Sequence, residues 1–330
     1  MLDDKAVLIT GGTGSFGRQI VQTLLSRFKP RRLVVFSRDE LKQSEMRERF
    51  SPREHSCLRY FIGDVRDPER LFDALRGIDV VVHAAALKQV PTAEYNPFEA
   101  IQTNVLGAQN VIRASIRQRV ERVIALSTDK AANPVNLYGA TKLCADKLFV
   151  AGNAMAGGDG PVFSVVRYGN VLGSRGSVVP LFLRKRAAGV LPVTDERMTR
   201  FSLTLDEGVD FVLGCLSWMR GGEIFVPKLP SYRILDVAKA IAPEARVELT
   251  GIRPGEKLHE TLVPADEAWH SLEYSDHFVI HAPGQWRERR VTIPPGVRQC
   301  PHGFSYTSEV NDAWLSVEQL RALIHPFIEG

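Results

Sequence analysis

The chain has 330 residues, of which 44% are hydrophobic and 24% are charged, and its formal net charge is +4. This composition excludes a disordered protein and allows a large buried core, in one domain or in two unequal ones. No arginine-rich tract interleaved with aromatic residues predicts nucleic-acid binding. No apolar run reaches the roughly 18 to 20 residues that a membrane span needs. We therefore expect neither nucleic acid nor a membrane among the partners of this chain.

The cysteines and histidines predict no metal site. The eight histidines form no cluster with ligand spacing. The four cysteines fit no zinc or redox motif, and we interpret them as reduced thiols: Cys57, Cys144, Cys215 and Cys300. The first six residues carry three charges, and no secretory segment precedes the first strand pattern. These features predict a cytoplasmic protein.

Short apolar runs alternate with longer amphipathic segments in the first half of the chain. The runs are rich in valine and isoleucine, which is typical of a parallel sheet covered on both faces. We predict strands at Ala6–Thr10, Leu33–Phe36, Leu58–Ile62, Val80–His83, Val123–Ser127 and Phe163–Tyr168. Helices are predicted between them at Phe16–Phe28, Glu40–Phe50, Pro68–Leu75, Pro97–Gln118 and Leu137–Ala154. This alternation predicts an α/β fold with a doubly wound parallel sheet, a Rossmann-type domain over residues 1–170.

The pattern becomes irregular after residue 170, where glycine and proline are frequent. We predict a helix at Leu205–Met219, a strand at Glu223–Pro227, a helix at Ile234–Ile241, a strand near Val247–Leu249 and a helix at Leu315–Ile324 capped by Ser316. Residues 171–330 are expected to form mainly a smaller, mixed substrate-binding domain, with 200–228 packing back on the first domain. Arg175 lies in this region, and we interpret the run Arg184–Arg186 as a solvated helix face.

A glycine-rich segment connects the first predicted strand to the first helix. Its glycines allow a tight turn, a close approach of the backbone to phosphate and close packing of helix on strand. The free N–H groups and the helix dipole of such a segment bind a pyrophosphate. We therefore predict that a dinucleotide binds at Gly11, Thr13, Gly14, Ser15, Phe16 and Gly17.

The end of the second predicted strand bears on the choice between NAD and NADP. A cofactor without the 2′-phosphate usually meets a carboxylate there, whereas one with it meets an arginine. Arg38 and Lys42, one helical turn apart, favour NADP, while Asp39 leaves NAD possible. Ser37 is assigned to the same site.

Residues after other predicted strands are assigned to the rest of the cofactor. Asp64 and Val65 follow the third strand and are expected near the adenine ring, although Asp64 is alternatively a helix cap. The small side chains after the fourth strand let the backbone approach the nicotinamide half of the cofactor. This set comprises Ala84, Ala85 and Ala86, and Val171 is added to it. We interpret His83, which ends the fourth strand, as structural.

A tyrosine and a lysine lie on the helix that follows the fifth predicted strand. Tyr138 and Lys142 are four residues apart, so they share one helix face. An ammonium beside a phenol lowers the pKa of the phenol, which lets Tyr138 accept a hydroxyl proton as hydride leaves the same carbon. Lys142 is also expected to bond the nicotinamide ribose.

Several motifs together resemble a known family. They are Thr10–Gly17, Ser37–Gln43, His83–Phe98, Ser127–Lys147, Arg167–Pro180, Met198–Phe201 and Arg253–Lys257, with a faint match at Trp314–Leu320. Through them the chain resembles the extended short-chain dehydrogenase/reductase superfamily. More narrowly, it is similar to the inverting UDP-N-acetylglucosamine 4,6-dehydratases that begin pseudaminic acid synthesis. The resemblance implies NADP as cofactor, a UDP-sugar as substrate and assembly into a homo-oligomer.

Lys130 separates two classes of dehydratase in this resemblance. Retaining relatives have an Asp-Glu pair after the threonine, whereas Thr128-Asp129-Lys130 resembles the inverting class. The resemblance implies that Tyr138 deprotonates the sugar 4-hydroxyl and that hydride passes from carbon 4 to NADP and back to carbon 6. Lys130 removes the proton of carbon 5, Asp129 donates to the departing 6-hydroxyl, and carbon 5 is reprotonated on the opposite face.

This chemistry needs a lowered pKa for Lys130 and a raised one for Asp129. The alternative interpretation of the two residues is a surface ion pair.

The resemblance and the phosphate chemistry of arginine also assign substrate contacts. Arg200 and Arg253 are predicted at the diphosphate and nucleotide, Glu256 at ribose hydroxyls, and Lys88 and Asn170 at the sugar-phosphate, with surface ion pairs or a solvated lysine as alternatives. The remaining predicted contacts are Thr128, Ser177, Val178, Val179, Pro180 and Thr194.

Two other functions fit parts of the pattern. A UDP-sugar 4-epimerase on the same scaffold needs only Tyr138 and Lys142, and the pair Asp129-Lys130 argues against it. A non-catalytic NADP-sensing scaffold does not need an intact tyrosine–lysine pair. An exposed apolar face on one of the helices Pro97–Gln118 and Leu137–Ala154 would favour a dimer formed by helix pairing.

Overall fold

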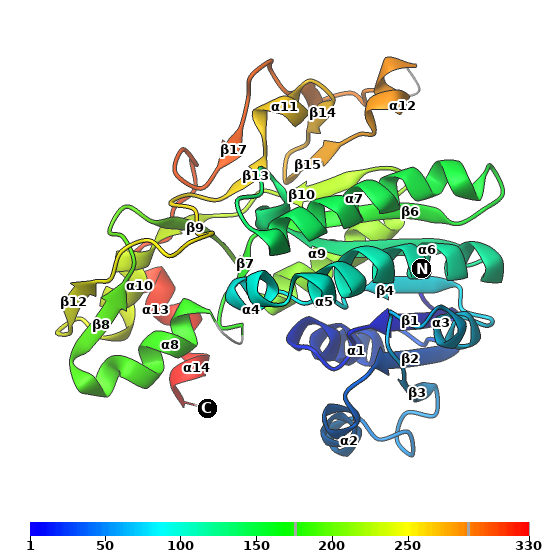
Figure 1. Cartoon of the computed structure of the whole chain (residues 1–330), viewed down its shortest axis with the longest axis horizontal. Coiled ribbons are helices and arrows are strands. Elements are labelled where there is room, and N and C mark those ends of the chain that lie inside the picture. Colours follow the sequence, from blue (N-terminus) through cyan, green and yellow to red (C-terminus); the bar gives the residue numbers. More distant parts are fainter. Residues whose placement is uncertain (175–176, 289–290, 330) are drawn as a thin grey trace.

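The computed structural model describes residues 1–174, 177–288 and 291–329, and its largest feature is one mixed sheet (Figure 1). Within these residues the sheet has ten strands in the order β16-β14-β15-β10-β6-β5-β4-β1-β2-β3. The strands from β10 to β3 pair in parallel, whereas β15, β14 and β16 pair antiparallel at one edge. The order of the parallel strands is that of a doubly wound sheet, so the predicted α/β fold class is confirmed.

Each predicted parallel strand forms where the sequence has a run of branched apolar residues. The six agree with prediction to within one residue at each end: β1 (Ala6–Thr10), β2 (Arg32–Ser37), β3 (Leu58–Ile62), β4 (Val80–His83), β5 (Arg122–Thr128) and β6 (Val162–Tyr168). A seventh, β10 (Ile224–Pro227), continues the array beyond β6. The central strands are buried along their whole length because helices cover both faces.

Two sets of helices cover the parallel strands. They are α1 (Ser15–Arg27), α2 (Glu40–Arg49), α3 (Pro68–Ala74), α6 (Gly107–Gln118), α7 (Leu137–Ala156) and α9 (Leu205–Trp218). Helix α1 packs against α9 on one face, and α3, α6 and α7 form a row on the other (Figure 1). None of the described helices is long and apolar enough to cross a bilayer.

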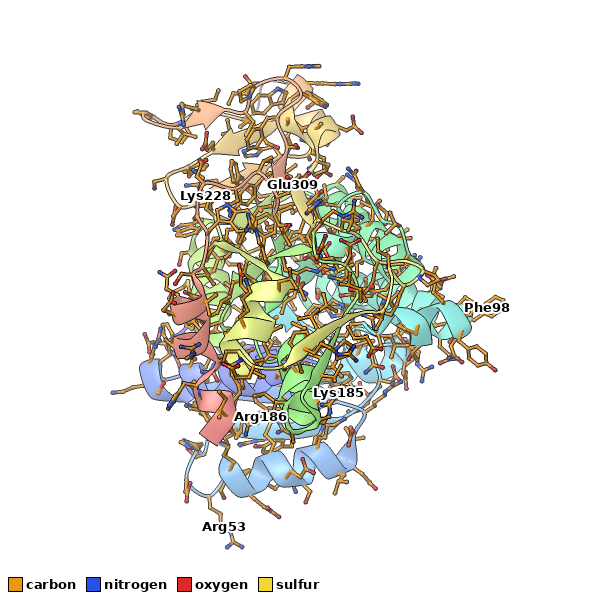
Figure 2. All side chains as sticks on the ribbon, turned by 90° about the vertical axis from the view of Figure 1, so that its left-hand side faces the viewer. Arg53, Phe98, Lys185, Arg186, Lys228 and Glu309 are labelled. Atoms are coloured by element: carbon orange, nitrogen blue, oxygen red, sulfur yellow. The ribbon has the colours of Figure 1, made fainter. Side chains whose placement is uncertain are left out.

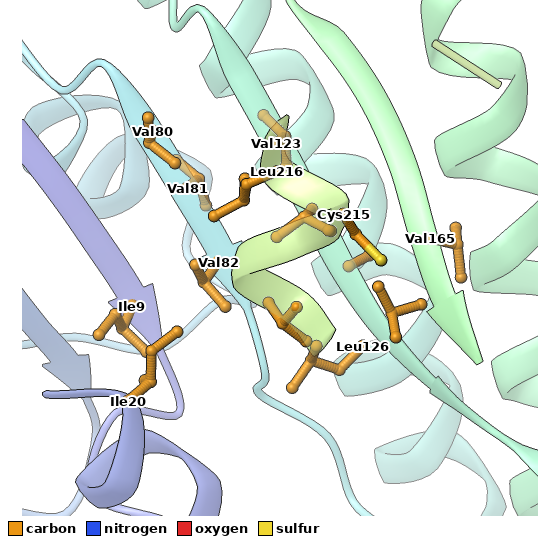
Figure 3. Packing of buried hydrophobic residues seen from close by; sticks show 14 of the residues in the cluster. Ile9, Ile20, Val80, Val81, Val82, Val123, Leu126, Val165, Cys215 and Leu216 are labelled. Atoms are coloured by element: carbon orange, nitrogen blue, oxygen red, sulfur yellow. The ribbon is translucent and has the colours of Figure 1, made fainter. Parts of the chain in front are cut away.

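The main core lies where α9 packs on the sheet. Figure 3 shows Cys215 and Leu216 of α9 beside the valines of the central strands. The residues that meet there are all buried: Ile9, Val81, Val82, Val123, Leu126, Val165, Cys215 and Leu216. This core fixes the strand ends from which the candidate site is built.

The single helix predicted at Pro97–Gln118 forms with an interruption. Helix α5 (Pro97–Ile101) leads into the π-helical turn Gln102–Leu106, which continues as α6. Asn104 in this turn is buried, and its amide accepts from the backbone N–H of Leu87 at 2.8 Å and donates to Oγ1 of Thr141 at 3.0 Å. The turn therefore links the loop after β4 to helix α7.

A second core is formed by segments that are distant in the sequence. It contains α8 (Val178–Lys185), α10 (Ile234–Ile241), α13 (Val317–Ile324) and β8 (Val190–Val193), while β12 (Arg246–Leu249) pairs with β8 and is exposed. Phe182, Val237 and Leu320 are fully buried in it. Ser316 caps α13 with a reciprocal hydrogen-bond pair to Gln319, as the sequence predicts for this residue. Helices α10 and α13 were predicted, whereas α8 was not.

Strands that the sequence pattern does not reveal lie between and beside the two cores. They are β7 (Asn170–Val171), β9 (Thr199–Leu203), β11 (Ser231–Arg233), β13 (Thr261–Val263), β14 (Ser271–Glu273), β15 (His277–Ile280), β16 (Arg298–Gln299) and β17 (Tyr306–Thr307). The short helices α4 (Val90–Tyr95), α11 (Ala265–Ala268), α12 (Pro283–Arg287) and α14 (Pro326–Glu329) complete the described elements. Because β14, β15 and β16 extend the large sheet, residues 171–330 contribute to both cores.

Candidate active site

One cavity of about 1110 Å³ lies at the carboxyl ends of β1 to β6 and extends to the second core. Almost all predicted cofactor and substrate residues line it, among them Gly11, Thr13, Gly14, Ser15, Phe16, Gly17, Ser37, Arg38, Asp39, Lys42, Asp64, Val65, Ala84, Ala85, Ala86, Lys88, Thr128, Asp129, Lys130, Tyr138, Lys142, Asn170, Val171, Ser177, Val178, Val179, Thr194, Arg200, Arg253 and Glu256. Pro180 is not among the lining residues. Arg175 lies outside the described residues. The basic run Arg184–Arg186 is exposed and does not line the cavity (Figure 2).

The glycine loop between β1 and α1 has the shape that a dinucleotide needs. Gly11 has φ +64°, and a Cβ on it would lie 2.8 Å from the backbone nitrogen of Ala85. A Cβ on Gly17 would lie 2.4 Å from the carbonyl oxygen of Gly12. Gly14 at the N-cap of α1 offers no side-chain hydrogen bond to the first turn, so the N–H groups there suit a phosphate.

The end of β2 presents two cations and one carboxylate to the cavity. Asp39 is the N-cap of α2 and accepts from the backbone N–H of Lys42 at 3.0 Å. The Lys42 ammonium lies 2.6 Å from the same carboxylate and, through this hydrogen bond, lowers the pKa of Asp39. Arg38 Nη1 lies 3.6 Å from Oδ2 of Asp64. The Asp39 carboxylate therefore binds groups of its own helix, α2.

Asp64 does not cap a helix. Its carboxylate accepts from the backbone N–H of Arg66 at 3.0 Å and from Nε of Arg66 at 2.9 Å. The cap of α3 is Asp67, whose side chain accepts from the N–H of Arg70. The alternative interpretation of Asp64 as a helix cap is therefore wrong, and Asp64 lines the cavity.

The wall after β4 is fixed by a buried hydroxyl. Oγ1 of Thr10 accepts from the backbone N–H groups of Ala84 at 3.2 Å and Ala85 at 3.3 Å. Oγ1 also lies 2.8 Å from Nδ1 of His83. Burial lowers the pKa of His83 to about 3, so the ring is neutral behind this wall.

The catalytic segments meet through a glycine. A Cβ on Gly139 in the first turn of α7 would lie 2.1 Å from the carbonyl oxygen of Lys130. Asn136 caps α7 by accepting from the N–H of Gly139 at 2.7 Å, and its amide donates to the carbonyl of Gly255 at 2.8 Å. These contacts hold the 3₁₀ turn Asp129–Ala131 against the start of α7.

Tyr138 and Lys142 line the same cavity from α7 and are both buried. Lys142 Nζ donates to the carbonyl of Leu126 at 2.7 Å, and burial lowers the pKa of this ammonium. Burial raises the pKa of Tyr138 to about 12, while the charge of Lys130 acts to lower it. The expected lowering by Lys142 is therefore wrong for this structure, because desolvation of the phenolate is the larger effect.

Asp129, which is buried, and Lys130, which is half-buried, form an ion pair with a third partner. Lys130 Nζ lies 3.0 Å from Oδ1 of Asp129 and 3.3 Å from Oε1 of Glu260. Oγ1 of Thr128 donates to the same Oδ1 at 2.8 Å. Asp129 is 1% exposed, so the alternative of a surface ion pair is wrong.

The shifts within this pair agree only in part with expectation. Burial raises the pKa of Asp129, and the charge of Glu260 adds to the effect. Burial alone lowers the pKa of Lys130, but the charges of Asp129 and Glu260 outweigh it, so the net pKa is raised. The expected lowering for Lys130 is therefore wrong in this structure, because two carboxylates flank its ammonium.

The predicted substrate arginines have different surroundings. Arg200 is buried, and its guanidinium donates to the carbonyls of Thr199 at 2.7 Å and Lys257 at 3.1 Å. Arg253 is exposed and pairs with Glu256, whose carboxylate also accepts from the Arg253 backbone N–H at 3.2 Å. Arg200 thus holds two segments together, while Arg253 has a side chain accessible from solvent.

Lys88 and Thr194 also reach the cavity. Lys88 is exposed, yet partial desolvation of its ammonium lowers its pKa, and the charge of Lys130 adds to this effect.

Buried polar atoms without a hydrogen-bond partner gather around the cavity. They are Thr103 Oγ1, Asp129 Oδ2, Asn170 Oδ1, Ser177 Oγ and Glu260 Oε2. Buried polar groups normally have a partner. These atoms are therefore suited to a polar ligand with several hydroxyl or amide groups.

Several lining residues were missed by sequence reasoning, among them Tyr232, Lys257 and Glu260. Lys257 is the last residue of the motif Arg253–Lys257, in which only Arg253 and Glu256 have a predicted role. Tyr232 and Glu260 have no local pattern that marks them, because their place in the cavity depends on the pairing of β11 with β9 and of β13 with β17. Among the described residues, no group of three histidine, cysteine or acidic side chains could hold a metal ion.

The chain is similar in sequence to enzymes of nucleotide-sugar metabolism. An inverting UDP-N-acetylglucosamine 4,6-dehydratase of Campylobacter jejuni is 50% identical, covering 98% of this chain and 98% of that protein. A UDP-glucose 4-epimerase of Rickettsia canadensis is 40% identical, covering 98% of this chain and 96% of that protein.

Solved structures agree with these relatives. The X-ray structure of Pen from Bacillus thuringiensis has a TM-score of 0.89 at 38% identity and covers 99% of this chain and 98% of its own. The dTDP-glucose 4,6-dehydratase DesIV of Streptomyces venezuelae shares the fold, with a TM-score of 0.69 at 23% identity over 77% of this chain and 86% of its own. A family model described as polysaccharide biosynthesis protein matches residues 7–282. The resemblance seen in the sequence is confirmed, and the chain belongs to this polysaccharide biosynthesis family of extended short-chain dehydrogenases/reductases.

Proposed function

We propose that the protein is a UDP-N-acetylglucosamine 4,6-dehydratase that inverts carbon 5 and keeps NADP bound as a catalyst. One observation carries the proposal: the ion pair of buried Asp129 and half-buried Lys130 lies in the same cavity as Tyr138 and Lys142. An epimerase needs only Tyr138 and Lys142. A dehydratase also needs an acid at carbon 6 and a base at carbon 5, and Asp129 and Lys130 supply them.

The first proton transfer belongs to Tyr138. Its phenolate oxygen takes the proton of the sugar 4-hydroxyl, and the charge of Lys130 favours the phenolate against the effect of burial. A dinucleotide held at the glycine loop would supply a reversible hydride carrier, which accepts hydride when oxidised and donates it when reduced.

The second proton transfer belongs to Lys130. Once Tyr138 has gained its proton, a negative charge near Lys130 is gone, which lowers the pKa of the ammonium when a base is needed. Lys130 releases its ammonium proton to solvent, and the neutral amine takes the proton of carbon 5. The electrons of that C–H bond form the double bond between carbons 5 and 6, while the 6-hydroxyl leaves as water with the proton of Asp129. The raised pKa of Asp129, caused by burial and by Glu260, suits a carboxyl that must hold a proton near neutral pH.

NADP is favoured over NAD by the engagement of Asp39. Its carboxylate caps α2 and pairs with Lys42, so it is less available to a ribose 2′-hydroxyl. Arg38 and Lys42 line the cavity at the same strand end and present two cations to a 2′-phosphate.

The UDP-sugar is proposed to occupy the part of the cavity between the two cores. Asn170 and Ser177 offer unpartnered buried oxygens there, and the exposed guanidinium of Arg253 suits the diphosphate. Lys88, Thr194 and Glu256 line the same region. The relative from Campylobacter jejuni is named for UDP-N-acetylglucosamine, which supports this sugar.

The second candidate function is a UDP-sugar 4-epimerase, as the name of the relative from Rickettsia canadensis suggests. The two differ in the mass of the product. Incubation with UDP-N-acetylglucosamine and catalytic NADP is expected to give a product lighter by one water, measured by mass spectrometry. A product of unchanged mass would identify the epimerase instead.

We further propose a cytoplasmic enzyme at the first step of pseudaminic acid or a related nucleotide-sugar synthesis.

A homo-oligomer is proposed because large apolar side chains are exposed along α4, α5 and the π-helical turn. Tyr95 is 87% exposed and Phe98 78% exposed, and Phe98 projects from the molecule in Figure 2. Ile101 and Leu106 continue this exposed face. A second copy of the chain would cover it.

A further inference from the structure

Glu260 is a buried carboxylate that the reaction steps above do not use. Its side chain lines the cavity, and the residue is 2% exposed. Its backbone is fixed on both sides by Ser308, whose Oγ accepts from the Glu260 N–H at 2.9 Å and whose N–H donates to the Glu260 carbonyl at 2.9 Å. The backbone position from which the Glu260 carboxylate extends is therefore fixed.

One oxygen of Glu260 serves two cations. Oε1 lies 3.3 Å from Lys130 Nζ and 3.5 Å from Arg200 Nε, while Oε2 is buried without a hydrogen-bond partner. Arg200 is itself anchored to backbone carbonyls, among them that of Leu258 at 2.9 Å. Glu260 thus connects the Lys130 amine to an anchored guanidinium.

We propose that Glu260 is a positioning residue that holds the amine of Lys130 at the cavity wall and keeps Asp129 in its protonated form. The inference rests on the proposed dehydratase function and extends it. Glu260 acts through Lys130 and Asp129, which touch the sugar in that proposal.

The charged groups around Asp129 and Glu260 differ, and this difference decides which of the two carboxylates is more readily protonated. The titratable groups facing Glu260 are Asp129 and Lys130 from the 3₁₀ turn, Arg200 from β9, Tyr232 from β11 and Lys257 from the loop before β13. Burial raises the pKa of Glu260, but its three cationic neighbours outweigh burial and lower it. Asp129 has Lys130 as its cationic neighbour and feels the negative charge of Glu260 as well.

Two carboxylates that share one ammonium do not ionise equally. The neighbouring charges therefore favour the ionised form of Glu260 and the protonated form of Asp129. This is the protonation state that an acid at carbon 6 requires. Without the charge of Glu260, Asp129 would ionise more readily beside Lys130, and the ammonium of Lys130 would lose its proton more readily.

The test is the pH dependence of turnover for wild type, Glu260→Gln and Glu260→Asp with UDP-N-acetylglucosamine. Glu260 raises the pKa of both Asp129 and Lys130, so Glu260→Gln is expected to shift the whole kcat profile toward lower pH by about one unit. We expect kcat at the wild-type optimum to fall and KM for the UDP-sugar to stay near its wild-type value. Glu260→Asp keeps the charge but places it one methylene further from Lys130 and Asp129, so its profile is expected to lie between the other two.

The matched control is Glu223→Gln, which removes a buried carboxylate outside the cavity, where Glu223 bonds Oγ of Ser164 at 2.6 Å. Its profile is expected to coincide with that of wild type. A Glu260→Gln profile that also coincides with wild type would overturn the inference, as would an unshifted Glu260→Asp profile if the glutamine variant does not fold. Failure of the wild-type enzyme to release water would instead overturn the proposed function.

Discussion

Asp129 and Lys130 share a hydrogen bond of 3.0 Å inside the cavity, and their neighbours shift the pKa of each group. The sequence marks both residues, because they follow a buried strand and precede Tyr138. Their pKa values were not predictable from the sequence. The raised pKa of Lys130 depends on Glu260, which lies 130 residues further along the chain and carries no local motif.

The choice of cofactor also rests on single residues. The double variant Arg38→Ala/Lys42→Ala is expected to raise KM for NADP by roughly 100-fold or more, since it removes two charge-assisted hydrogen bonds that contribute about 1.5–3 kcal/mol each, and to leave KM for NAD nearly unchanged. The measurement is dehydration rate against the concentration of each cofactor added to the apoenzyme. Arg53→Ala is the control, because Arg53 is exposed and outside the cavity (Figure 2). Equal losses with NADP and NAD would argue against a 2′-phosphate site.

Among the elements, the start of α7 contributes most to the site. Asn136 caps this helix, and Gly139 lets the 3₁₀ turn carrying Lys130 approach it. The sequence predicts the helix and its tyrosine–lysine face, because both depend on local periodicity. The approach of the turn was not predictable, since Gly139 reads as an ordinary glycine within Tyr138–Lys142.

Gly139→Ala tests this approach. The added Cβ would lie 2.1 Å from the carbonyl of Lys130, so the turn must shift. We expect the free energy of unfolding in urea to fall by about 1–3 kcal/mol and kcat to fall with it. Gly284→Ala in α12 has no atom within 4 Å of the new Cβ, and stability is expected to be unchanged or raised by about 0.4–1 kcal/mol. Equal stability of the two variants would contradict the tight contact.

On the scale of the whole molecule, the first six parallel strands follow from their apolar runs, whereas in the second half of the chain the longer helices follow from local patterns and most of the strands do not. Its strands are short, and β14, β15 and β16 pair with a sheet whose other members lie earlier in the sequence. The second core likewise joins Phe182 to Leu320. Local patterns carry no information on such distant pairings, which is why Tyr232 and Glu260 were missed.

The proposed homo-oligomer is a further property of the whole molecule. Phe98→Asp places a charge on the exposed apolar face of α4 and α5 and is expected to shift the mass in analytical ultracentrifugation toward the monomer, because a desolvated carboxylate opposes association. Val310→Asp is the control, since Val310 is 72% exposed but lies in the C-terminal segment. An unchanged mass for Phe98→Asp would place the interface elsewhere.

The most direct test of the account is the product formed from UDP-N-acetylglucosamine in D₂O, followed by NMR for wild type and Lys130→Ala. The account predicts a 4-keto-6-deoxy sugar of inverted configuration with deuterium at carbon 5 for wild type. Lys130→Ala is expected to lose dehydration while still binding the cofactor. A product that retains the configuration at carbon 5, or a Lys130→Ala enzyme that dehydrates at the wild-type rate, would contradict it.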